Sequence, residues 1–96
     1  MVLRRGRRVE NPLFRATFKE NDLGWPRFAF IVSRAVAKRA VKRNLLRRRA
    51  REWVRKQLVF FKKSVDVAVF LKKEATEASR KKFYEELERL TAGIMR

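Results

Sequence analysis

Residues 28–71 place a long basic segment between two apolar ones. The three segments read FAFIV at 28–32, RAVKRNLLRRRAREWVRKQL at 39–58 and VDVAVFL at 65–71. β-Branched and aromatic residues favour strands in the outer segments. The middle segment has many helix formers and no Gly or Pro. We therefore expect strand, helix, strand, with the last strand at the centre of a sheet.

A further strand is expected N-terminal to this stretch. Apolar and polar residues alternate over 9–19, and together with 28–32 they define one apolar face, formed by Phe14, Ala16, Phe18, Phe28, Phe30 and Val32. Residues 21–26 (NDLGWP) are a turn cluster. Because the loop is short, we expect the two strands that it joins to form an antiparallel hairpin.

The chain is expected to end in an amphipathic helix. Thr76 is a candidate N-cap, with Glu77 in the first turn, and one apolar stripe follows at helical spacing, formed by Phe83, Leu87, Leu90 and Ile94. Residues 1–8 are expected to be a loose start. The predicted order is β-β-α-β-α, a single α+β domain over residues 1–96 that combines one mixed sheet with helices.

Composition excludes several classes of protein. The chain has 96 residues, with 27 Lys and Arg against 10 Asp and Glu, a net charge of +17, and no His or Cys. Zinc and iron–sulfur centres lose their usual ligands, and a His base, a Cys nucleophile and disulfides are excluded. No apolar run is long enough to cross a membrane. A cytoplasmic protein with a polyanionic partner is expected.

The positive charge is concentrated on one face of the predicted helix. Residues 34–64 contain 13 basic residues and one acid, Glu52. With about 100° per residue, an apolar stripe forms one side of the helix, from Leu46, Ala50, Trp53 and Val54. The adjoining side, which we call the arginine face, consists of Arg43, Asn44, Arg47, Arg48, Arg51 and Arg55.

Arginine on this face is suited to phosphate. Its planar guanidinium donates to two phosphate oxygens at once and stacks on bases, and neighbouring cations that repel one another favour a polyanion, which releases counterions on binding. A solvated face that serves solubility is the plain alternative, and a helix lying on a membrane is another. Asn44 is a candidate for outer-sphere contact with a hydrated metal.

Residues 28–52 resemble the protein subunit of bacterial ribonuclease P. In that family a strand ending in Val-Ser-Lys precedes a helix with the signature R-N-R-x-K-R-x-x-R-E. Here the strand ends in Val-Ser-Arg at 32–34, and the signature reads RNLLRRRARE at 43–52. The resemblance extends from about Gly6 to Ile94 and includes GRRVEN at 6–11 and DVAVF at 66–70.

The resemblance implies a ribosomal-protein-like fold with the basic helix in a βαβ crossover. It also implies that the chain binds ribonuclease P RNA and the 5′ leader of precursor tRNA, with no membrane or obligate protein partner. The RNA performs the cleavage, with Mg²⁺ that no dedicated protein site holds, so no residue of the chain is catalytic. The residues implied in binding the catalytic RNA are Arg43, Asn44, Arg47, Arg48 and Arg51, with Lys42 and Arg55 as further candidates.

The leader is expected on the sheet face beside this helix. The residues of that groove are Arg15, Thr17, Ala29, Ile31 and Ser33, and the strand-to-helix junction adds phosphate contacts from Arg34, Lys38 and Arg39. The sequence leaves open which sheet face lines the groove, because exposed aromatic residues also stack on bases. We interpret the aromatic face as core because a small domain needs large apolar groups.

The sequence departs from the family pattern in two ways, and other functions remain open. Leu45 replaces the second Arg of the signature, off the arginine face, and the family's N-terminal helix has no counterpart at the start of this chain. A ribosomal-type RNA-binding structural protein is the main alternative, followed by a DNA-binding protein and a nuclease. A metal cluster of Glu10, Glu20 and Asp22 is the weaker reading of three acids that we interpret as turn and surface residues.

Overall fold

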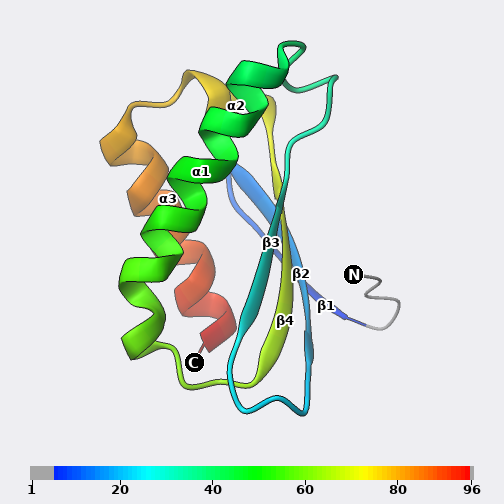
Figure 1. Cartoon of the computed structure of the whole chain (residues 1–96), viewed down its shortest axis with the longest axis vertical. Coiled ribbons are helices and arrows are strands. Elements are labelled where there is room, and N and C mark those ends of the chain that lie inside the picture. The colour runs from blue at the N-terminus through cyan, green and yellow to red at the C-terminus, as the bar shows by residue number, and fades with distance from the viewer. Residues whose placement is uncertain (1–5, 96) are drawn as a thin grey trace.

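The computed structural model of the chain describes residues 6–95 (Figure 1). Its strands are β1 (Arg7–Glu10), β2 (Phe14–Glu20), β3 (Arg27–Ile31) and β4 (Val65–Leu71). Its helices are α1 (Ala40–Gln57), the 3-10 turn η1 (Leu58–Phe60), α2 (Lys73–Glu77) and α3 (Arg80–Met95). The expected α+β class is confirmed, and the order has one more strand and one more short helix than the sequence predicted.

The four strands form one mixed sheet in the order β1-β2-β4-β3. The central strand β4 is antiparallel to β2 and parallel to β3, so β3, α1 and β4 form the expected βαβ crossover. The predicted hairpin is wrong, because β4 lies between β2 and β3. The most apolar strand takes the position that is covered on both edges, and Val65, Val67, Val69 and Leu71 are buried there.

The loop at 21–26 connects two strands that do not pair, and it is fixed by the segment that leads into β4. The backbone N–H of Asn21 donates to the carbonyl oxygen of Ser64 at 3.0 Å, and the N–H of Gly24 donates to the Ser64 hydroxyl at 2.9 Å. Gly24 has φ 86°, which a residue with a side chain rarely adopts. The turn at 21–26 was therefore predicted correctly, but its hydrogen bonds to Ser64 were not.

The alternating segment at 9–19 is divided into two strands by an Asn-Pro turn. The side-chain oxygen of Asn11 accepts from the N–H groups of Leu13 and Phe14 at 3.0 and 2.9 Å, which reverses the chain. β1 then pairs antiparallel with β2. Arg7 and Arg8, expected in a loose start, are already in β1; residues 1–5 lie outside the described residues.

The last helix begins later than predicted. Ala78 is extended and separates α2 from α3. The hydroxyl of Ser79, not of Thr76, accepts from the N–H of Lys82 at 3.1 Å, as an N-cap does. Thr76 lies inside α2, where its hydroxyl donates to the carbonyl of Lys73. The short α2 comes first, and its Ala75 is fully buried in the core.

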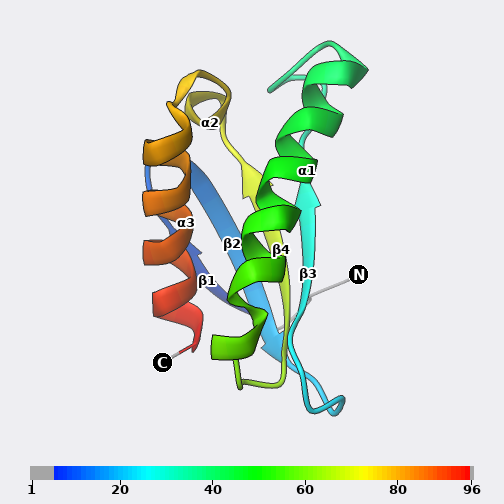
Figure 2. The same ribbon diagram turned by 60° about the vertical axis from the view of Figure 1, so that its left-hand side comes forward.

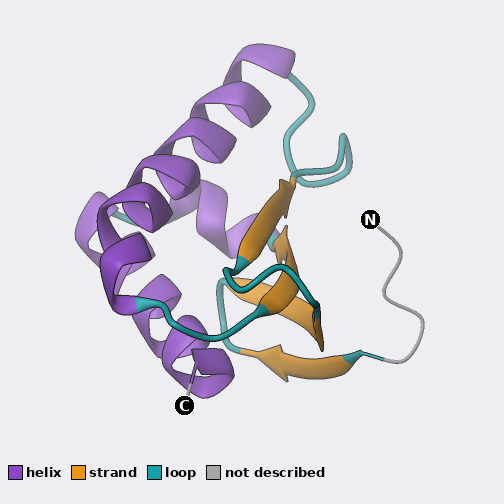
Figure 3. Ribbon diagram, turned by 60° about the horizontal axis from the view of Figure 1, so that its bottom comes forward, coloured by secondary structure: helices purple, strands orange, loops and turns teal. Residues whose placement is uncertain are grey.

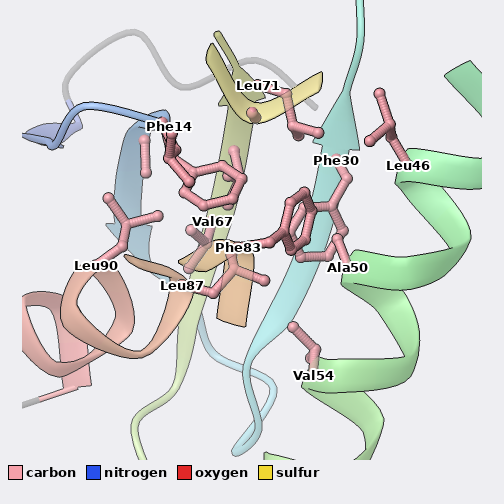
Figure 4. Close-up of a cluster of buried hydrophobic side chains, with 14 of the residues drawn as sticks. Phe14, Phe30, Leu46, Ala50, Val54, Val67, Leu71, Phe83, Leu87 and Leu90 are labelled. Atoms are coloured by element: carbon pink, nitrogen blue, oxygen red, sulfur yellow. The ribbon is translucent and has the colours of Figure 1, made fainter. Parts of the chain in front are cut away.

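Both long helices cover the same face of the sheet (Figure 2). The predicted stripe of α3 is buried throughout, and on α1 Leu46, Ala50 and Val54 are buried with Trp53 at the margin. Figure 4 shows the side chains that meet between these layers. The predicted apolar face of the sheet is confirmed, with Phe28 only half-buried.

The opposite face of the sheet has no helix over it within the described residues (Figure 3). None of the helices between residues 6 and 95 has the length and apolar content to span a bilayer. The fold therefore leaves two surfaces open to a partner, which are the outer side of α1 and the uncovered sheet face.

Candidate nucleic-acid interface

The arginine face lies on the solvent side of α1, and its members differ in exposure. Arg48, Arg51, Arg55 and Asn44 are exposed, whereas Arg43 and Arg47 are half-buried. This follows from the helical period, since Arg43 and Arg47 border the stripe that packs on β3. The exposed members follow one another at steps of about one turn from Asn44 to Arg55 and are available to a ligand along the helix.

Arg43 is also a structural residue. Its guanidinium donates to the carbonyl oxygens of Ala37 at 3.0 Å and Lys38 at 2.7 Å. These carbonyls belong to the segment that leads into α1, where the N-cap residue Arg39 provides no side-chain hydrogen bond. Arg43 therefore fixes the entry to the helix. This role could not be predicted from the sequence, because it depends on how the chain folds back before residue 40.

Asn44 lies beside the arginines of the arginine face, whereas Lys42 lies on another side of the helix. The side-chain oxygen of Asn44 accepts a hydrogen bond from Arg47. This is the same oxygen that was predicted to contact a hydrated metal. Lys42 is half-buried, and the 100° step of the helix places it on the side away from Arg47. The structure therefore brings Asn44 together with the arginines and separates Lys42 from them.

Arg49 points away from the arginine face, toward α3. Its guanidinium carbon lies 5.3 Å from the centre of the Phe83 ring, and its Nε is buried without a hydrogen-bond partner. A cation over an aromatic ring is stabilised by the ring quadrupole. Arg49 thus packs between the two helices and does not add to the solvent-facing arginines.

Within residues 6–95, the arginine face takes part in no ion pair. The ion pairs among residues 6–95 join Arg27 to Asp66, Lys72 to Glu10, and both Lys82 and Arg89 to Glu86. None of them involves α1. Cations that the fold does not neutralise favour a polyanionic ligand, and arginine forks match phosphate oxygens.

The uncovered sheet face gathers most of the predicted leader residues. In the register of the sheet, Arg15 and Ile31 flank Phe70, and Thr17 and Ala29 flank Ala68. The guanidinium carbon of Arg15 lies 5.1 Å from the centre of the Phe70 ring. A hollow of about 520 Å³ opens here, lined by Arg15, Ile31, Ser33, Val36, Phe70, Leu71, Lys72, Lys73 and Glu74.

Phe70 is the residue of this face that sequence reasoning missed. The alternation of VDVAVFL places Asp66, Ala68 and Phe70 on the side opposite the buried valines. That signal was present, but the expected hairpin put no strand between β2 and β3. With β4 between them, an aromatic ring occupies the centre of the predicted groove.

The junction residues Arg34, Lys38 and Arg39 connect the two surfaces. They are exposed on the segment between β3 and α1, which Ser33 organises by accepting from the N–H groups of Val36 and Ala37 at 3.1 and 3.0 Å. Ser33 lines the hollow on the sheet face, and Arg39 immediately precedes α1. A positively charged path therefore leads from the sheet face to the arginine face.

The acids nearest the sheet are held by cations. Arg27 donates to both carboxylate oxygens of Asp66 at 2.8 Å and lowers the pKa of that carboxyl from 3.8 to about 2, and Asn21 adds a hydrogen bond at 2.9 Å. A hydrogen bond from Lys72 lowers the pKa of Glu10.

The three acids considered as a metal cluster do not converge. Glu10 pairs with Arg15 near the start of β2, whereas Glu20 ends that strand. Among residues 6–95, no three or more His, Cys, Asp or Glu side chains form a group that would hold a metal ion.

These surfaces place the chain among small basic α+β proteins that bind nucleic acid. The family model described as Ribonuclease P matches residues 1–95. The chain therefore belongs to the ribonuclease P protein family. The ribosomal-type alternative is not favoured.

Relatives support the same family. The chain is 33% identical over 76 residues to the ribonuclease P protein component of Thermotoga petrophila, covering 79% of this chain and 64% of that protein. It is 31% identical over 96 residues to the Thermotoga maritima component, covering 100% of this chain and 74% of that protein. The chain thus spans about two thirds to three quarters of the length of these relatives.

Solved structures share the fold. The T. maritima RNase P protein in complex with 1-(4-fluorophenyl)-2-thiourea has a TM-score of 0.82 and 28% identity, with 90% of this chain and 83% of that chain covered. The Staphylococcus aureus RNase P protein has a TM-score of 0.84 at 22% identity, with 95% and 84% covered. The second likeness concerns the fold alone.

Proposed function

We propose that the chain is the protein component of a ribonuclease P ribonucleoprotein, in which it binds the catalytic RNA and the 5′ leader of precursor tRNA. The observation that carries this proposal is the arginine face, which coincides with the family signature and has no ion pair within the described residues. The catalytic RNA lies along Arg47, Arg48, Arg51 and Arg55, whose guanidinium groups contact its phosphates.

The leader lies on the uncovered sheet face. Arg15 meets its phosphates, while Phe70 and Ile31 offer apolar surface to its unpaired bases, as exposed aromatic residues of RNA-binding sheets do. Arg34, Lys38 and Arg39 contact the backbone where the leader passes toward the catalytic RNA. One small protein then holds enzyme RNA and substrate RNA side by side.

The cleavage itself belongs to the RNA and its Mg²⁺. The chain contains no His or Cys, and Asp66 and Glu10 are held by Arg27 and Lys72. A protein with these side chains is suited to position phosphates rather than to activate water. By neutralising phosphates, the arginine face lowers the Mg²⁺ concentration that the RNA needs to stay compact.

Reconstitution with a bacterial ribonuclease P RNA tests the proposal. We expect the chain to stimulate 5′ cleavage of precursor tRNA at low Mg²⁺ and to tighten binding of leader-bearing substrate relative to mature tRNA. Absence of both effects would overturn the proposal. Stimulation without any preference for the leader would leave the arginine face assigned and remove the assignment of the sheet face.

A matched pair of variants tests the sheet face directly. Arg15→Gln removes the cation beside Phe70 and is expected to reduce the preference for leader-bearing substrate. Lys19→Gln removes an equal charge from the same strand and the same face, opposite Asp66, and is expected to retain the preference. Equal losses in both variants would mean that only the total charge of the sheet matters.

A further inference from the structure

A second hollow lies between β3 and the C-terminal half of α1, on the helix side of the sheet. It has a volume of about 190 Å³, and the strand side contributes Pro26, Phe28 and Phe30, while the helix side contributes Arg51, Val54, Arg55 and Leu58. It is separate from the hollow on the uncovered face. Figure 4 shows Phe30 and Val54 on the facing sides of the two elements.

The hollow exists because α1 covers β3 unequally along its length. Phe28 and Phe30 point to the same side of the strand, yet Phe30 is 7% exposed and Phe28 is half-buried. Leu58, at the start of η1, is 42% exposed. Apolar surface is therefore open to solvent at the end of the arginine face.

The aromatic side of the hollow is supported from behind. The Phe28 ring lies nearly parallel to that of Phe30, with centroids 6.2 Å apart and planes 8° apart. The centre of the Phe28 ring also lies 5.7 Å from that of Phe61, which in turn lies 6.2 Å from that of Trp53. A row of packed rings loses little conformational freedom when a further planar group contacts it.

The charge around the hollow selects its occupant. Arg51 and Arg55 lie on the helix side one turn apart, and none of the lining residues is acidic. A planar apolar group attached to an anion satisfies both features, and an unpaired nucleotide is such a group. A second copy of the chain would instead bring two sets of these arginines together, in a protein with a net charge of +17.

We infer that this hollow binds one unpaired nucleotide of the RNA that lies on the arginine face. The base contacts Phe28 and Leu58, and its flanking phosphates contact Arg51 and Arg55. The inference rests on the proposed RNA binding by the arginine face and adds a base contact to what would otherwise be contact with phosphates alone. It also accounts for the exposed leucine beside cationic side chains.

Binding of short single-stranded RNA by the full chain tests the inference. The probes are an eight-nucleotide oligoadenylate and an abasic oligomer with the same number of phosphates. Fluorescence anisotropy is expected to show tighter binding of the oligoadenylate, by about fivefold to a hundredfold for each base that stacks on an aromatic side chain, in this hollow or at Phe70 on the sheet face. Equal affinities would overturn the inference.

Leu58→Ser and Val59→Ser form a matched pair, because both residues are exposed in η1 and only Leu58 lines the hollow. Leu58→Ser is expected to reduce the preference for the base-bearing probe about threefold or more and to leave binding of the abasic probe unchanged. Val59→Ser is expected to change neither. Equal effects of the two variants would contradict the inference.

Further measurements separate this inference from the proposed function. Arg48→Gln, on the arginine face but outside the hollow, is expected to weaken binding of both probes equally. If it does so while Leu58→Ser has no effect, the arginine face stands and the nucleotide site falls; if neither variant changes binding, both fall. Sedimentation of the free chain as a dimer that Leu58→Ser dissociates would assign the hollow to a second copy and overturn the inference.

Discussion

The two long helices, α1 and α3, perform the same packing task with different charge. Each lays an apolar stripe on one face of the sheet, with Leu46, Ala50 and Val54 on α1 and Phe83, Leu87, Leu90 and Ile94 on α3. On α3, the buried Glu86 accepts from Lys82 and Arg89 at 3.0 and 3.1 Å. None of the ion pairs among the described residues involves α1. The outer side of α1 instead exposes Arg48, Arg51 and Arg55.

The comparison separates what the fold requires from what a ligand requires. A helix packs on this sheet with its charges balanced, as α3 shows, so the exposed arginines of α1, which are Arg48, Arg51 and Arg55, are not needed for packing. Repulsion among them destabilises the free protein. A ligand that supplies phosphates removes that cost, which is why we assign the excess charge of α1 to RNA binding.

Truncation of one buried leucine on each helix shows whether α1 and α3 pack equally tightly on the sheet. Leu46 on α1 and Leu87 on α3 are fully buried, and truncation of either to Ala leaves a cavity. We expect each variant to lose about 2–5 kcal/mol of unfolding free energy, measured by urea denaturation. A much smaller loss of unfolding free energy for Leu46→Ala than for Leu87→Ala would mean that α1 packs less tightly than α3 in the free protein.

A smaller effect distinguishes two members of the arginine face. Arg43→Gln removes the hydrogen bonds to the carbonyls of Ala37 and Lys38 and is expected to cost about 1–3 kcal/mol. Arg48→Gln removes an exposed cation and is expected to change the unfolding free energy by less than about 0.5 kcal/mol. Urea denaturation of both variants checks this. Similar losses of unfolding free energy would show that the hydrogen bonds of Arg43 do not stabilise the entry to α1.

The smallest effect concerns acid stability away from both helices. The pKa of Asp66 is about 2 in the folded protein against 3.8 as the ordinary value. Because the folded pKa is the lower one, its stabilisation is present above pH 3.8 and is lost as the pH falls toward 2. Asp66→Asn is therefore expected to be less stable than the parent chain near neutral pH and to approach it near pH 2.

Denaturation curves of the two proteins across this range give the measurement. A stability difference that stays constant down to pH 2 would show that the ion pair with Arg27 does not titrate. The same variant serves as a control for the helices, because Asp66 lies in β4 and outside both of them.

Local features of the sequence predicted the elements well and the topology less well. The 3.6-residue period located the arginine face and the stripe of α3, because those patterns need no knowledge of distant residues. The prediction of a hairpin was wrong because strand pairing depends on which strand buries most surface. The more apolar β4, and not β3, pairs with β2. The N-cap lies at Ser79 and not at Thr76 because a separate short helix, α2, comes first, with its Ala75 buried in the core.

The same limit applies to the candidate site. The arginines of α1 were placed on one helix face from their spacing, and alternation placed Arg15, Thr17, Ala29 and Ile31 on one sheet face. Their assignment to the leader came from the family resemblance and stays a prediction. Phe70 and the hollow beside Phe28 were missed because both require the strand order and the angle at which α1 crosses β3. The bracing role of Arg43 was missed because the turn at Ser33 brings carbonyls to it.

We propose that the position of the positive charge, and not its amount, determines RNA binding. Two double variants lower the net charge equally, Arg48→Ala with Arg51→Ala on α1, and Arg80→Ala with Lys81→Ala on α3. The measurement is the affinity for ribonuclease P RNA as a function of salt concentration. We predict weaker binding and a log–log salt slope shallower by about two units for the α1 pair only; equal losses in the two pairs would contradict the claim.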